Sequence, residues 1–120
     1  MTKKILIIDD EVEFADTVKM MLETGGYRVM AAHDGKSGLA MAKKNSPDLI
    51  LLDLVMAQMN GFAVLSELKK DPYTAAIPVV VVTAKTESEY ALDAENLGAA
   101  GYLSKPVKRH ELEACVRKFF

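Results

Sequence analysis

Acidic side chains follow two apolar runs in this sequence, and their oxygens suit a metal ion and a phosphoryl group. Asp9 and Asp10 come directly after the run Ile5–Ile8. A single Asp53 comes directly after the run Leu49–Leu52. Carboxylates a few ångströms apart repel one another by roughly 4 kcal/mol per pair at an effective dielectric constant near 20. Mg²⁺ relieves such repulsion with a few carboxylate ligands and keeps positions open for water and phosphate, so the pattern predicts a magnesium and phosphate site.

A purely structural interpretation of the first acidic cluster is also open. Asp10 and Glu13, three residues apart, match a capping box, in which two side chains bond the free backbone N–H groups at the start of a helix. These residues alone do not decide between a cap and a metal site. The remainder of the chain has to decide.

The length and composition predict a single globular domain over residues 1–120. Half of the residues are hydrophobic and 27% are charged, which is typical of a globular fold. Lys and Arg number 15 against 17 Asp and Glu, so no basic excess favours nucleic acid as a direct partner. The apolar run before Asp9 is too short for a signal peptide or a membrane span. We therefore expect no membrane association and a cytoplasmic location.

Apolar runs alternate with amphipathic stretches along the chain. The runs predict five strands, near residues 4–9, 27–32, 48–53, 78–83 and 100–104. Between them lie helical patterns such as Phe14, Val18 and Leu22, whose spacing gives one apolar face, and Thr86 with Glu89 predicts a capping box for the fourth helix. Strands alternating with helices predict an α/β fold, a doubly wound parallel sheet with helices on both faces.

Ligands of doubly wound sheets bind beyond the carboxyl ends of the strands, where the strand order reverses. The predicted fourth and fifth strands end at Thr83 and Lys105. A threonine hydroxyl can donate a hydrogen bond to a phosphoryl oxygen, and a lysine ammonium supplies a compact positive charge to another. An aspartate can attack phosphorus as a nucleophile and form an acyl phosphate. If the first and third strands are neighbours, one edge of the sheet gathers all of these groups.

Five segments resemble the receiver domain of bacterial two-component response regulators, and the resemblance covers all 120 residues. Each segment alone is weak evidence, whereas five in order with receiver-like spacing are specific. They are Ile7-Ile8-Asp9-Asp10-Glu11, Asp48-Leu49-Ile50-Leu51-Leu52-Asp53-Leu54, Met59-Asn60-Gly61-Phe62, Val80-Val81-Val82-Thr83-Ala84 and Gly98-Ala99-Ala100-Gly101-Tyr102-Leu103-Ser104-Lys105-Pro106. The resemblance implies a five-stranded, flavodoxin-like sheet of order 2-1-3-4-5.

The resemblance also implies a phosphoacceptor and a metal site. Asp53 would accept a phosphoryl group from a histidine kinase or a histidine phosphotransfer protein. The cofactor would be Mg²⁺, or Mn²⁺ in its place. Its ligands would be Asp10 and Asp53 directly, Asp9 through a water molecule, and the backbone carbonyl of Val55.

Further residues take roles by the same resemblance. Thr83 and Lys105 would bind the phosphoryl group, and the Lys105-Pro106 peptide bond would be cis. Tyr102 resembles an aromatic switch residue that turns inward when the threonine moves toward the phosphoryl group, although its spacing alone favours an ordinary strand aromatic. The surface formed by residues 86–120 would then dock a downstream protein or an attached output domain, or form a dimer on phosphorylation.

Such a domain would catalyse only its own phosphorylation and dephosphorylation, so we do not expect an enzyme acting on outside substrates. A degenerate receiver that binds proteins without phosphorylation is the main alternative. A flavin-binding module would need a Ser/Thr/Gly-rich loop in place of Asp9-Asp10-Glu11. A metal-dependent phosphatase with an aspartyl intermediate would need a carboxylate where Val55 stands.

Overall fold

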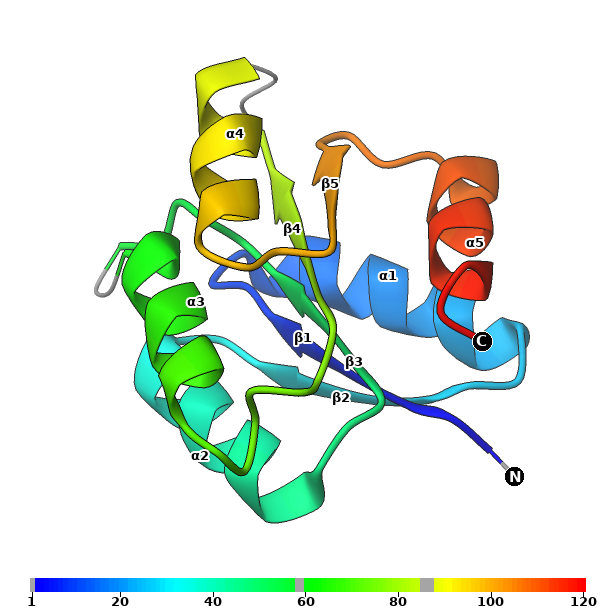
Figure 1. Ribbon diagram of the computed structural model, residues 1–120. Coiled ribbons are helices and arrows are strands. Elements are labelled where there is room, and N and C mark those ends of the chain that lie inside the picture. The colour runs from blue at the N-terminus through cyan, green and yellow to red at the C-terminus, as the bar shows by residue number, and fades with distance from the viewer. Residues whose placement is uncertain (1, 58–59, 85–87) are drawn as a thin grey trace.

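A computed structural model describes residues 2–57, 60–84 and 88–120, and only the backbone at Ser88 and Glu89. The predicted capping box of the fourth helix depends on Thr86, which lies outside the described residues. Strands and helices alternate within these ranges (Figure 1). In chain order they are β1 Lys4–Ile8, α1 Val12–Thr24, β2 Arg28–Ala32, α2 Gly35–Asn45, β3 Leu49–Leu52, α3 Gly61–Lys70, β4 Val79–Thr83, α4 Ser88–Asn96, β5 Gly101–Ser104 and α5 Arg109–Arg117.

The strands form one parallel sheet in the order β2-β1-β3-β4-β5, as predicted. Each strand begins and ends within one residue of its predicted bounds. Ile8 pairs with Leu52 across β1 and β3, so these two strands end side by side. The residues that follow them, Asp9 and Asp53, therefore lie together at the carboxyl edge of the sheet.

Helices cover both faces of the sheet (Figure 1). Successive strand residues pack into opposite cores. Leu6 and Ile8 of β1 pack in the core beneath α2, α3 and α4. Ile5 and Ile7 pack in the second core beneath α1 and α5. The continuous apolar runs are fully covered because a strand between two helical layers has no solvent face.

Short polar side chains and glycines set the helix ends. Asp34 accepts a hydrogen bond from the Ser37 N–H at 2.7 Å and begins α2, and Asn60 accepts one from the Phe62 N–H at 2.7 Å and begins α3. After α1 the chain turns through Gly26, whose φ of +95° favours glycine.

The capping interpretation of Asp10 and Glu13 is wrong. Helix α1 begins at Val12, its N-cap residue is Glu11, and the Glu11 side chain makes no capping hydrogen bond. Asp10 instead accepts a hydrogen bond from the Ala57 N–H at 2.8 Å, in the loop after β3. Its carboxylate is therefore held by a segment far along the chain and does not cap its own helix.

The described helices do not include one with the length and apolar character needed to cross a bilayer.

Gly38 allows α2 to pack directly on β1, and this contact gives a test of the fold. A Cβ at position 38 would lie 2.7 Å from Ile8 Cδ1 and 2.8 Å from Ile8 Cγ1. Alanine normally stabilises a helix interior by about 0.5–1 kcal/mol relative to glycine, but overpacking costs about 1–3 kcal/mol. We expect Gly38→Ala to lower the free energy of unfolding by about 1–2 kcal/mol in urea denaturation. In an Ile8→Ala background the same substitution should be neutral or stabilising, and an unchanged cost there would contradict the contact.

Candidate functional site

Three aspartates form a cluster at the carboxyl edge of the sheet. Asp9, Asp10 and Asp53 each present a carboxylate oxygen, and these oxygens all lie within 4.8 Å of one another. Strand pairing places them, because the Asp53 N–H donates to the Ile8 carbonyl at 2.9 Å and the Asp9 N–H donates to the Ala32 carbonyl at 3.0 Å. Asp9 and Asp53 are only 1% and 3% exposed, so solvent and salt screen their charges much less than those of surface groups.

Backbone N–H groups orient each of the three carboxylates. The pairs are Glu11 N–H to Asp9 Oδ1 at 2.9 Å, Val55 N–H to Asp53 Oδ1 at 3.0 Å and Ala57 N–H to Asp10 Oδ2 at 2.8 Å. In the first two pairs the aspartate side chain bonds the backbone two residues later, a turn that aspartate commonly forms. One oxygen of each carboxylate is thus fixed by the main chain.

Lys105 supplies the positive charge of the site. Its side chain is 8% exposed, and Nζ lies 2.8 Å from Asp9 Oδ2, 2.7 Å from Glu11 Oε1 and 3.4 Å from Asp53 Oδ2. Nζ also lies 4.3 Å from the centre of the Phe14 ring, close enough for a cation–π interaction. Burial lowers the pKa of Lys105, but its bonds to Asp9 and Glu11 outweigh burial and raise the pKa above the usual value. Lys105 is therefore held as a cation.

Thr83 lies beside Lys105 and carries an unsatisfied hydroxyl. The Lys105 N–H donates to the Thr83 carbonyl at 2.7 Å, so the two residues are joined through the backbone. The Thr83 side chain is 1% exposed, and its Oγ1 has no hydrogen-bond partner among the described residues. A buried hydroxyl without a partner costs about 1–3 kcal/mol, so such a group at the edge of an ionic cluster suggests that a ligand completes it.

The charge of Asp53 is costly in this position. The pKa of Asp53 is raised from 3.8 to about 6. Burial is the largest cause and the nearby Asp9 carboxylate adds to it, while the hydrogen bond from the Val55 N–H and the contact with Lys105 oppose the rise. Between pH 3.8 and about 6 the folded chain therefore binds more protons than the unfolded chain. As a result, ionisation of Asp53 lowers the free energy of unfolding as the pH rises through about 6.

This shift predicts that Asp53→Asn stabilises the metal-free chain in a pH-dependent manner. The gain in free energy of unfolding should reach at most about 3 kcal/mol near pH 7.5 and should vanish near pH 4, where the native carboxyl is neutral. Thermal unfolding in EDTA at both pH values measures it. Asp16→Asn removes the same charge from an exposed position of α1 and should show no such dependence. An equal gain from Asp53→Asn at both pH values would contradict the shift.

The structure brings most of the sequence-predicted site residues together at this edge. Asp9, Asp10, Asp53 and Lys105 are joined by the contacts above, with Thr83 bonded to Lys105 through the backbone. The Lys105-Pro106 peptide bond is cis. Val55 contacts Asp53 through its N–H group, while metal coordination by its carbonyl stays a prediction.

Tyr102 does not join the carboxylates. It lies in the middle of β5, paired with Val81, and packs while half-buried against the core beneath α2, α3 and α4. Its position is compatible with either of the two interpretations of this residue. Its role as a switch stays a prediction.

Two residues of the site were not singled out from the sequence alone. Glu11 has no role of its own in the sequence prediction, where it stands only within the motif after the first strand, whereas in the structure its carboxylate accepts a bond from Lys105. Gly61 allows close packing behind the phosphoacceptor candidate, because a Cβ there would lie 2.2 Å from the Asp53 carbonyl oxygen. The glycine is visible within the motif after Asn60, but only the tertiary contact gives the reason for it.

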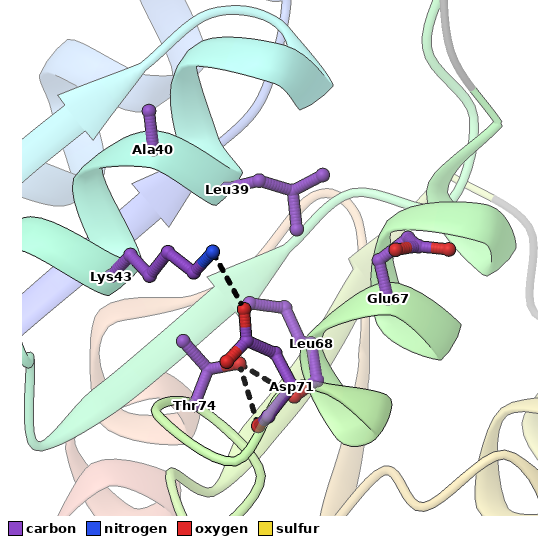
Figure 2. Close-up of a pocket in the computed structure, with 7 residues that line it drawn as sticks. All are labelled: Leu39, Ala40, Lys43, Glu67, Leu68, Asp71 and Thr74. Carbon is purple, nitrogen blue, oxygen red and sulfur yellow. Dashed lines mark hydrogen bonds and ion pairs between the residues drawn. The ribbon is translucent and has the colours of Figure 1, made fainter.

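A separate cavity of about 320 Å³ lies between α2 and α3. Figure 2 shows Lys43 of α2 reaching Asp71 at the end of α3, an ion pair of 3.0 Å, with the Thr74 hydroxyl donating to the Leu68 carbonyl at 2.6 Å. Helix α3 ends at the edge where β4 begins, opposite the edge that carries Asp53. This cavity is therefore separate from the aspartate cluster.

Comparisons with known proteins identify the family. The family model of the response regulator receiver domain matches residues 5–117. The chain belongs to the receiver domain family of two-component response regulators.

Individual relatives agree with this assignment. Protein PilH of Pseudomonas aeruginosa is 39% identical over 109 residues, which cover 91% of this chain and 90% of that protein. The DNA-binding dual master transcriptional regulator RpaA of Synechocystis is 42% identical over 114 residues, which cover 95% of this chain but only 47% of RpaA. Among solved structures, the chemotaxis protein CheY4 of Vibrio cholerae superposes with a TM-score of 0.95 at 28% identity, covering 100% of both chains.

Proposed function

We propose that this receiver domain accepts a phosphoryl group on Asp53 from a histidine kinase or a histidine phosphotransfer protein and passes the signal on through its α4-β5-α5 surface. The buried cluster carries the proposal, because it combines a carboxylate of raised pKa, a fixed ammonium and an unsatisfied hydroxyl. Family membership supports the class of donor. We also propose that the domain acts in the cytoplasm, as the family assignment suggests.

The transfer is a displacement at phosphorus. A carboxylate oxygen of Asp53 attacks the phosphorus atom, the bond from phosphorus to the donor imidazole nitrogen breaks, and the imidazole keeps the electron pair and takes up a proton. Lys105 lies 3.4 Å from Asp53 Oδ2 and can bind an oxygen of the transferred group. The Thr83 hydroxyl can donate to another once the group is in place.

The donor set fits a hard divalent cation. The three carboxylate oxygens within 4.8 Å of one another are the ligand type that Mg²⁺ prefers, and their mutual repulsion gives a cation a favourable site. We propose that Asp10 and Asp53 bind it directly, Asp9 through water, and Val55 through its carbonyl. When bound, Mg²⁺ or Mn²⁺ supplies positive charge that offsets the charge on the transferring phosphoryl group.

Output would arise from a shift between two conformations. A modification shifts such an equilibrium only as far as its interaction free energies with the two conformations differ. Changing the ratio of the two conformations from 1:99 to 99:1 needs a difference of about 5.5 kcal/mol. Charge-assisted bonds from Lys105 and Thr83 to the phosphoryl group are suited to contribute to this difference, with Tyr102 of β5 as the proposed switch residue. The surface of α4, β5 and α5 would then bind a downstream protein or an attached output domain, or form a dimer.

We propose no turnover of outside substrates, because the domain would act only on its own phosphoryl group. A phosphorylation-independent binding module remains the alternative function. The intact set of Asp10, Asp53, Thr83 and Lys105 argues against it, since a module that never binds a phosphoryl group gains nothing from a buried uncompensated charge.

Phosphorylation itself is the decisive test of the proposal. We expect intact mass after incubation with acetyl phosphate to show a single phosphoryl adduct that requires Mg²⁺. Asp53→Asn should abolish the adduct, while Asp16→Asn, which removes an exposed charge on α1, should retain it. A folded chain that forms no adduct, under conditions that label a control receiver, would favour the phosphorylation-independent module.

Metal binding gives an independent test. We expect Mg²⁺ to raise the thermal midpoint of the native chain, because it binds the folded cluster and not the unfolded chain. Asp10→Asn should weaken the binding measured by calorimetry at least about tenfold, since one direct carboxylate ligand is lost. Asp48→Asn, which alters a carboxylate at the other edge of the sheet, serves as the control. Equal Mg²⁺ affinities for Asp10→Asn and the native chain would contradict the assigned ligand.

A further inference from the structure

Glu11 differs from the other partners of Lys105. Three carboxylate oxygens lie 2.7–3.4 Å from Nζ, and an ammonium has three N–H donors. Asp9 and Asp53 are buried, whereas the Glu11 side chain is 63% exposed and makes the shortest of the three contacts. All donors of Lys105 are therefore engaged before a phosphoryl group arrives.

A phosphoryl group must displace one of these carboxylates to bind Lys105. Moving Asp9 or Asp53 away would leave a buried charge without its partner, which is strongly unfavourable. Glu11 can rotate into water and keep its charge solvated, so it is the partner that is easiest to displace. Its backbone stays in place meanwhile, because its N–H group bonds Asp9 Oδ1 at 2.9 Å.

We propose that Glu11 is a positioning residue that competes with the phosphoryl group for Lys105 and so slows the phosphorylation of Asp53. It holds the ammonium beside Asp53 in the unphosphorylated state and must release it before Lys105 can fully bind the transferred group. The inference rests on the proposed function, because it concerns the rate of that same phosphorylation.

The test compares rates of adduct formation from acetyl phosphate, by intact mass over time at saturating Mg²⁺. We expect Glu11→Gln to react roughly twofold to fivefold faster than the native chain. This is the change in rate that corresponds to the free energy of one exposed ion pair. Glu11→Ala should be at least as fast, since a glutamine carbonyl can still accept a bond from Lys105. Glu13→Gln removes the same charge from the first turn of α1 and should react at the native rate.

Two further readouts separate competition from a structural role. The acceleration should shrink in about 0.5 M salt, because an exposed ion pair is screened. Thermal midpoints should change little, whereas a residue needed for folding would lower both stability and rate. A Glu11→Gln rate equal to or below the native rate, or an equal acceleration by Glu13→Gln, overturns this inference alone. Absence of the adduct in every variant and in the native chain overturns the proposed function, and this inference with it.

Discussion

The structure depends on one unbalanced charge cluster at the carboxyl edge of the sheet. In the part of the chain described by the structure, three carboxylates, those of Asp9, Glu11 and Asp53, contact the ammonium of Lys105. A carboxylate oxygen of Asp10 lies within 4.8 Å of those of Asp9 and Asp53. Repulsion among them opposes folding, and the apolar layers on both faces of the sheet offset it. The charges of the site thus lower the stability of the fold. A cation or a phosphoryl ligand that binds there interacts with these charges most strongly.

The surrounding main chain holds the charged groups of the cluster in fixed positions. Strand pairing fixes Asp9 and Asp53, main-chain N–H groups orient their carboxylates, and Gly61 allows the loop to pack against the Asp53 carbonyl. Charged groups held before the ligand arrives need little reorganisation when charge develops on a transferring group. Within the described ranges, the buried Thr83 hydroxyl lacks a hydrogen-bond partner. Its place on β4 beside β5 connects the site to the α4-β5-α5 surface.

The local balance around Lys105 also shows how a family site can be adjusted in one member. Asp9 and Asp53 are buried partners that belong to the reacting centre, whereas Glu11 is exposed and replaceable. An exposed ion pair is worth little to stability. It would nevertheless affect the rate of phosphorylation if, as we propose, it breaks each time a phosphoryl group binds Lys105. Variation at such a position can change how fast the domain responds without changing what it does.

The sequence by itself determined the strand bounds, the doubly wound α/β fold with helices on both faces of the sheet, and the identity of the cluster, because buried parallel strands are continuous apolar runs and ligand residues follow their carboxyl ends. It left the role of Asp10 open, since a capping box and a metal ligand share the same local pattern. Only the tertiary structure decided that Asp10 bonds the loop after β3, that Glu11 pairs with Lys105, and that the Thr83 hydroxyl is buried with no partner among the residues that the structure describes. These are contacts between residues distant in the chain, and local spacing carries no information about them.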